Sequence, residues 1–168
     1  MSGKILVACV GNIFLGDDAF GVEVAQALGK RELPESVSVK DFGIRGLDLA
    51  YALLDPWEMV ILVDALPRGQ AAGTLYVLEP TLTFSEAAEI NPHGMDPVRV
   101  LNLAASMGTI SAKVLVVGCE PEDFGDEFEG RMGLSAPVRA RVEEAANLVM
   151  EQVANSKLIS MQLQTVER

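Results

Sequence analysis

A few carboxylates and one histidine in this sequence could together hold a divalent metal ion. The adjacent carboxylates Asp17 and Asp18 stand in the stretch GNIFLGDDAFG, which follows an apolar run. A third carboxylate, Asp64, ends another apolar run, and His93 is the single histidine of the chain. One imidazole and two carboxylates suit zinc, nickel or a similar divalent ion. With one coordination position left open, such a site can polarise a carbonyl group or activate a water molecule.

Each of these residues also has an ordinary structural explanation. An aspartate at a helix start caps backbone N–H groups, which explains one member of the Asp17–Asp18 pair better than both. Asp64 lies close to the core and needs a backbone donor, a cation or a metal as its partner. A lone loop histidine such as His93 is more often a surface side chain. The spacing alone leaves open whether Asp17 or Asp18 faces a ligand.

Several other catalytic signatures are missing from the sequence. It contains no G-x-S-x-G nucleophile elbow, no G-x-x-x-x-G-K-[ST] phosphate loop, no G-x-G-x-x-G dinucleotide motif and no H-E-x-x-H zinc motif. Both cysteines, Cys9 and Cys119, lie within apolar runs, which predicts buried and reduced thiols. A cysteine nucleophile would need a nearby base, and His93 is the one histidine available for that task.

Apolar runs and turn residues alternate in the order of an α/β protein. Strands are expected at 4–10, 36–43, 58–66, 73–80 and 113–121, and helices at 17–30, 46–55, 96–108 and about 135–153. The strand at 73–80 is bounded by Gly and Pro, which suits a sheet edge. This order predicts a single-domain three-layer sandwich, with a twisted and mostly parallel central sheet flanked by helices. Polar residues after the parallel strands should gather at one edge, where such proteins bind ligands.

The length of 168 residues suits one domain, which we assign to residues 1–155, followed by a poorly patterned C-terminal tail at 156–168. The formal net charge of −11 argues against nucleic acid or an anionic membrane as a partner, because both need clustered Lys and Arg. No stretch reaches the roughly 18 apolar residues of a spanning helix, and the N-terminus lacks the features of a secretory signal. We therefore expect a cytoplasmic protein.

Five stretches, in order along the chain, carry a resemblance to a known family. They are ILVACVGNIFLGDDAFGVEVAQAL, VILVDAL, INPHGMDPVRVL, VLVVGCEPE and GLSAPV. The first is similar to a pattern that reads roughly G-N-x-L-x-x-D-[DE]-G-x-G. Over about residues 4–153, the sequence resembles the [NiFe]-hydrogenase maturation proteases.

This resemblance implies an endopeptidase and its site. Members of the family remove the C-terminal extension of the hydrogenase large-subunit precursor after nickel insertion. The family's metal-contacting and catalytic trio falls on Asp18, Asp64 and His93 in this sequence. The metal implied is a divalent ion, the nickel that the substrate carries. We expect Asp17 to cap the helix and orient the loop, and we expect a monomer whose partner is the precursor.

The sequence also departs from the family pattern. Ala19 stands where glycine is usual, Ile44 stands where threonine is frequent, and the loop at 122–133 is long and acidic. Two other functions stay open: a peptidase of the same fold that acts on an unrelated protein, and a non-catalytic α/β module that binds a metal or a partner. Within the peptidase interpretation, one aspartate could instead serve as a general base.

Overall fold

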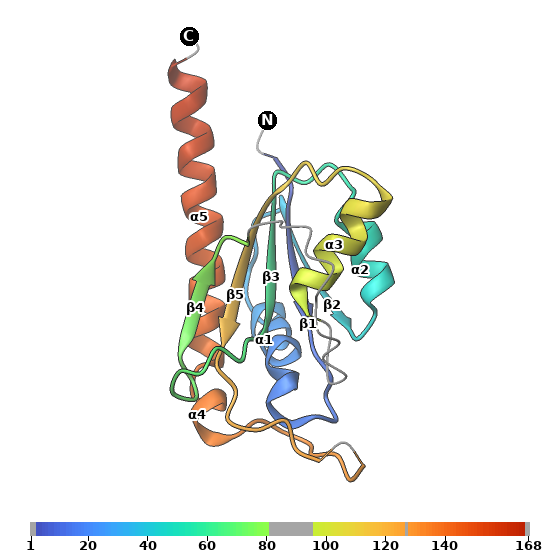
Figure 1. Ribbon diagram of the computed structural model, residues 1–168. Helices are drawn as coiled ribbons and strands as arrows, with labels where there is room; N and C mark the ends of the chain where they lie inside the picture. The colour runs from blue at the N-terminus through green and yellow to red at the C-terminus, as the bar shows by residue number, and fades with distance from the viewer. Residues whose placement is uncertain (1–2, 81–95, 127, 167–168) are drawn as a thin grey trace.

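The apolar runs of the sequence form one five-stranded sheet in a computed structural model of the chain (Figure 1). The structure describes residues 3–80, 96–126 and 128–166. In chain order its elements are β1 (Ile5–Val10), the 3-10 helix η1 (Gly16–Ala19), α1 (Phe20–Gly29), β2 (Val37–Gly43), α2 (Gly46–Ala52), β3 (Met59–Ala65), β4 (Leu75–Leu78), α3 (Pro97–Met107), β5 (Lys113–Cys119), α4 (Ala136–Arg139) and α5 (Val142–Val166).

The sheet has the strand order β2-β1-β3-β5-β4. β1 pairs in parallel with both β2 and β3, and β3 pairs in parallel with β5. β4 lies at the edge and runs antiparallel to β5, in agreement with the edge position that its flanking Gly73 and Pro80 predict. The predicted fold class, an α/β sandwich with a mostly parallel sheet between helices, is confirmed.

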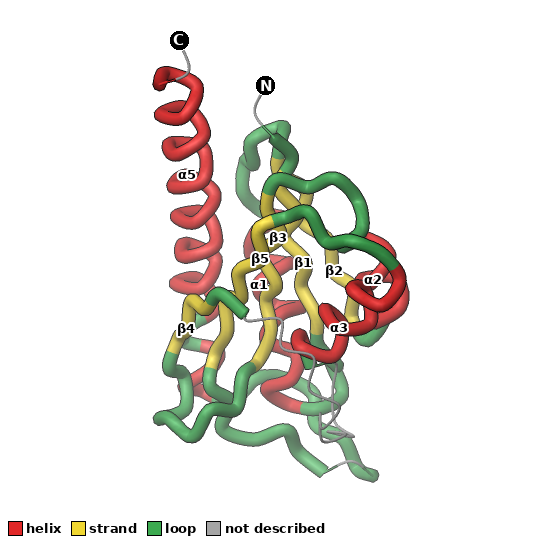
Figure 2. The backbone as a smooth tube through the Cα atoms, turned by 45° about the horizontal axis from the view of Figure 1, so that its top comes forward, coloured by secondary structure: helices red, strands yellow, loops and turns green. Residues whose placement is uncertain are grey.

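Alternate residues of β1 face opposite sides of the sheet and belong to two separate cores. Val7 and Cys9 pack with residues of α1 and α5, whereas Leu6 and Ala8 pack with residues of α2 and α3. Figure 2 shows this division, with α2 and α3 on one side of the strands and α5 on the other. Because every residue of β1 is buried, the strand is apolar throughout instead of alternating with polar residues.

The carboxyl ends of β1 and β3 meet where the order of the strands reverses. β1 lies between β2 and β3. The connection after β1 runs through α1 on one face, while α2 and α3 cover the other face. Ligands of open α/β sheets bind in the crevice at such a point. Asp18 follows β1 and Asp64 lies near the end of β3, so the topology delivers both carboxylates to this position.

The C-terminal helix is longer than the sequence pattern predicts. We expected an unpatterned tail from residue 156, but α5 continues to Val166 and extends beyond the sheet (Figure 1). Residues 142–166 contain no Gly or Pro, so nothing in the local sequence ends the helix. Within the described ranges, no helix combines the length and apolar character needed to cross a membrane.

Gly21 allows the start of α1 to lie directly on the ends of β1 and β3. A Cβ atom at this position would clash with the backbone carbonyl oxygens of Val10 and Val63. Because backbone cannot move aside as a flexible side chain can, Gly21→Ala is expected to lower the free energy of unfolding by about 1–3 kcal/mol. Gly29→Ala, in the same helix, is the matched control, since nothing lies within 4 Å of its added Cβ. Chemical denaturation of both variants tests this packing, and equal stabilities would contradict it.

Candidate active site

The start of α1 brings the segment of Asp18 to the end of β3. Gly21 lies against the carbonyl oxygens of Val10 and Val63. Asp18 precedes Gly21 by three residues, and Asp64 directly follows Val63. The charge of Asp18 also raises the pKa of Asp64, in agreement with this arrangement of the backbone. The structure therefore brings together two of the three residues that the sequence assigned to a metal site.

Asp64 is a buried carboxylate, with 3% of its surface exposed. Its Oδ1 accepts a hydrogen bond of 2.8 Å from the backbone N–H of Ala65. Burial raises the pKa of Asp64 well above its ordinary value, the charges of Asp18 and Asp96 raise it further, and the hydrogen bond from Ala65 opposes them. A cation between the two carboxylates would offset both the repulsion and the burial of charge. The pair has the donor atoms and the charge that suit a divalent ion.

Asp18 lies in η1 and is held by the loop that follows β1. Its Oδ2 accepts a hydrogen bond of 3.1 Å from the backbone N–H of Asn12. Gly11 permits this close turn, because its φ is 153° and a Cβ there would collide with the Asp18 carbonyl oxygen. Gly11 and Asn12, which open the stretch GNIFLGDDAFG, thus bring the loop after β1 close to the Asp18 carboxylate.

Asp17 does not cap a helix, so that prediction is wrong. Neither η1 nor α1 begins with a side-chain cap. The Asp17 carboxylate instead accepts hydrogen bonds from the N–H groups of Glu122 (2.8 Å), Asp123 (3.1 Å) and Ser135 (2.7 Å), and from the Ser135 hydroxyl (2.8 Å). Burial alone would raise the pKa of Asp17, but these hydrogen bonds, those from Ser135 foremost, lower it. Asp17 therefore anchors the segment that follows β5.

The acidic loop at 122–133 runs beside the Asp18 segment and pairs with it. The Arg131 N–H donates to the Phe14 carbonyl oxygen (2.8 Å), and the Gly16 N–H donates to the Arg131 carbonyl oxygen (2.9 Å). The Arg131 guanidinium also forms an ion pair of 2.8 Å with Asp123. Together with the Asp17 contacts, these bonds make the loop part of the frame around Asp18.

Glu120 is a second buried carboxylate with a structural task. It follows β5 directly, is 5% exposed, and accepts hydrogen bonds from the N–H groups of Arg68 (2.7 Å), Gly69 (2.7 Å) and Gln70 (3.1 Å) and from the Tyr76 hydroxyl (3.0 Å). Burial would raise the pKa of Glu120, but the hydrogen bonds lower it. The sequence places this residue at a strand end without revealing that it holds the loop after Asp64.

His93 lies outside the described residues, so its position in the trio stays a prediction. The described chain resumes at Asp96, which is the N-cap of α3. The Asp96 side chain accepts a hydrogen bond of 2.9 Å from the Val98 N–H. Asp96 contributes to the raised pKa of Asp64, and it follows His93 by three residues. Among the described residues, no group of three His, Cys, Asp or Glu side chains is arranged to hold a metal ion.

The two cysteines are free and buried, as their apolar surroundings predict. Burial raises the pKa of Cys119 to about 12, with a further contribution from the charge of Asp17. Burial also raises the pKa of Cys9, and the charges of Asp41 and Asp64 add to the effect. A nucleophilic cysteine needs a lowered pKa, so neither thiol is suited to act as a nucleophile.

Comparison with known proteins assigns the chain to a family. The family model described as "Hydrogenase maturation protease" matches residues 22–152. The chain belongs to the hydrogenase maturation protease family. It is 31% identical to the hydrogenase 2 maturation protease of Escherichia coli (strain K12), over 91% of this chain and 92% of that protein. It is also 31% identical to the hydrogenase expression/formation protein HoxM of Azotobacter vinelandii, over 94% of this chain and 75% of that protein.

The fold of this maturation protease agrees with a solved structure of the family. The hydrogenase maturating endopeptidase HybD from E. coli superimposes with a TM-score of 0.75 and 30% sequence identity, covering 91% of this chain and 93% of that chain. The family inferred from the sequence, the α/β fold and the assignment as a peptidase are confirmed.

Proposed function

We propose that this maturation protease is an endopeptidase that removes the C-terminal extension of a [NiFe]-hydrogenase large-subunit precursor after nickel insertion. The observation that carries the proposal is the meeting of two buried carboxylates, Asp18 and Asp64, at the carboxyl ends of β1 and β3. In the proposal the nickel belongs to the substrate, and Asp18, Asp64 and His93 recognise it. The donor set of two oxygens and one imidazole nitrogen fits a first-row divalent ion.

The protein contributes position, charge and a place for a proton. Asp18 and Asp64 come from two different strand ends, so an ion that contacts both is fixed relative to the sheet, and the attached peptide is fixed with it. The bound ion supplies polarisation of the scissile carbonyl or of the attacking water. In the alternative within this proposal, the carboxylate that the ion leaves free acts as a general base and accepts a proton from that water.

Cleavage of a defined precursor tests this proposal. Purified protein is mixed with nickel-loaded precursor, and the precursor's mass is followed by mass spectrometry. We expect a mass loss that matches the C-terminal extension, and no loss when the precursor carries no nickel. His93→Ala is expected to abolish the loss, because one of three recognising groups is gone. Precursor that binds but is never shortened would instead support a non-catalytic binding module.

A further inference from the structure

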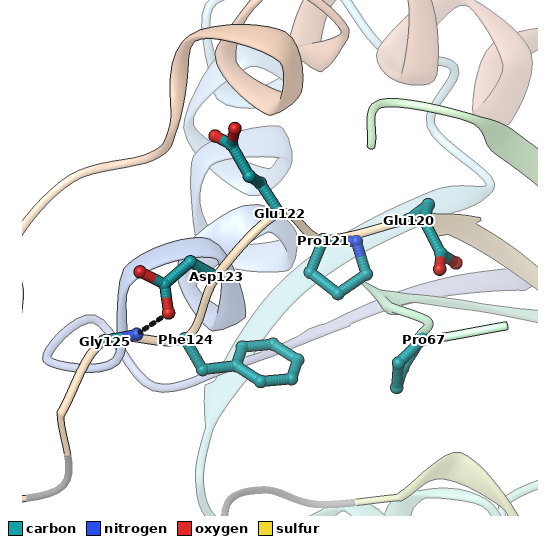
Figure 3. Close-up of a pocket in the computed structure, with 7 residues that line it drawn as sticks. All are labelled: Pro67, Glu120, Pro121, Glu122, Asp123, Phe124 and Gly125. Atoms are coloured by element: carbon teal, nitrogen blue, oxygen red, sulfur yellow. Dashed lines mark hydrogen bonds between the residues drawn. The ribbon is translucent and has the colours of Figure 1, made fainter. Parts of the chain in front are cut away.

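A pocket of about 420 Å³ opens between the loop after β3 and the loop after β5, past the ends of these two strands. Its apolar walls are Pro67, Pro121 and Phe124 (Figure 3). We call it the Pro–Phe pocket. Its volume lies in the range of small-ligand sites, about 300–1,000 Å³, which is ample for a side chain of a bound peptide.

The walls of the Pro–Phe pocket belong to the same segments that carry and anchor the carboxylates. Pro67 follows Asp64 by three residues. On the other side, the backbone that joins Pro121 to Phe124 is tied to Asp17, the neighbour of Asp18, by the N–H groups of the two intervening residues. The pocket and the two carboxylates are therefore held by connected backbone segments.

Three acidic residues border the pocket, yet their carboxylates are engaged elsewhere or directed away. Glu120 accepts three backbone N–H groups and the Tyr76 hydroxyl. Asp123 pairs with Arg131 at 2.8 Å and accepts the Gly125 N–H at 2.8 Å. The Glu122 side chain extends away from the apolar walls in Figure 3. A ligand in the pocket thus meets three apolar side chains, and an acidic side chain there would also lie near three carboxylates of like charge.

We propose that the Pro–Phe pocket binds an apolar side chain of one of the two substrate residues that flank the cleaved bond. This inference rests on the proposed function, and it assigns the pocket the role of a specificity site. The pocket selects by the free energy of apolar burial, while the carboxylates and the metal fix the position of the bond. Phe124 is the largest apolar side chain that lines the pocket, and it is partly buried against the core.

Precursor variants test the specificity. The residue on each side of the cleaved bond is replaced in turn by Leu, Ala or Asp, and kcat/KM is measured for every variant. At one of the two positions we expect wild-type protein to prefer Leu over Asp by about 10–100-fold, as apolar pockets discriminate. Phe124→Ala should reduce that preference at least several-fold. Phe124→Trp, which narrows the pocket while keeping an apolar wall, should shift the preference from Leu toward Ala.

Phe128→Ala is the matched control for these variants. Phe128 lies in the same loop, is 96% exposed and does not line the pocket, so its removal should leave the preference within about twofold of wild type. Wild-type protein that cleaves all precursor variants alike would overturn the pocket proposal and leave the proposed function standing. Equal effects of Phe124→Ala and Phe128→Ala on the preference would overturn the pocket proposal in the same way. Wild-type protein that leaves every precursor intact would overturn both proposals.

Discussion

Asp64→Asn is expected to abolish cleavage of the precursor while making the metal-free protein harder to unfold. The substitution removes a buried charge that lies near Asp18. The Asn side-chain oxygen can still accept the hydrogen bond from the Ala65 N–H. Loss of the carboxylate removes an oxygen donor to the ion or, in the alternative, the general base, so we expect kcat/KM to fall by about 10²–10⁴-fold.

The stability gain of Asp64→Asn should depend on pH with a definite sign. The folded-state pKa of Asp64 is raised, so the cost of its ionisation grows as the pH rises above the unfolded pKa and is complete once the pH exceeds the folded-state pKa. The cost disappears when the pH falls below the unfolded value of about 3.9. The free energy of unfolding, measured in chelator at several pH values, should therefore exceed that of wild type by about 1 kcal/mol or more at high pH, and the gain should vanish near pH 4.

Asp55→Asn is the matched control for Asp64→Asn. Asp55 is exposed and precedes β3, at the opposite end of that strand. Its variant should keep wild-type cleavage and wild-type stability. An active Asp64→Asn variant, or an inactive one that has lost its fold, would contradict the role given to Asp64. Asp18→Asn should reproduce the loss of cleavage, because it removes the other carboxylate of the pair.

Asp17→Ala is expected to destabilise the protein more than a substitution at Gly21, Asp18 or Asp64. The carboxylate of Asp17 is fully buried and accepts hydrogen bonds from Glu122, Asp123 and Ser135. Its removal leaves several donors without their acceptor, at about 1–3 kcal/mol for each buried group. We therefore expect the free energy of unfolding to fall by about 3 kcal/mol or more, and the acidic loop to detach from the segment of Asp18.

Hydrogen exchange and acid titration together test this role of Asp17. In Asp17→Ala, exchange should quicken at the amides of Glu122, Asp123 and Ser135. The folded-state pKa of Asp17 is lowered, so its contribution is fully present above about pH 3.9 and is lost as the pH falls through the folded value. The stability difference from wild type should therefore shrink in acid. Unchanged amide exchange in Asp17→Ala, or a stability difference from wild type that grows in acid, would contradict the role of Asp17 as an anchor of the segment after β5.

The sequence predicted the strands of the sheet more completely than it predicted which groups the individual side chains contact. Continuous apolar runs identified β1, β3 and β5, because strands covered on both faces leave no room for polar alternation. The choice between Asp17 and Asp18 depends on Ser135, which is 118 residues away along the chain from Asp17. Local spacing contains no such information, and only the resemblance to the maturation proteases favoured Asp18 for the site.

The Pro–Phe pocket and the role of Glu120 were also beyond local sequence reasoning. The pocket forms where the loop after β3 meets the loop after β5, which comes much later in the chain. Glu120 reaches back to the backbone of Arg68, Gly69 and Gln70. The position of a carboxylate directly after a buried strand indicates that it needs hydrogen-bond donors. Which donors it meets depends on the strand order, because that order decides which loops lie side by side.

The most direct test of the central claim is the position of a metal ion in crystals of the protein soaked with Ni²⁺, located by anomalous diffraction at the nickel edge. We expect one strong peak at the carboxyl ends of β1 and β3. An oxygen of Asp18, an oxygen of Asp64 and a nitrogen of His93 should each lie about 2.0–2.2 Å from it. A peak elsewhere, or a peak at this edge that His93 or either carboxylate does not contact, would contradict the claim.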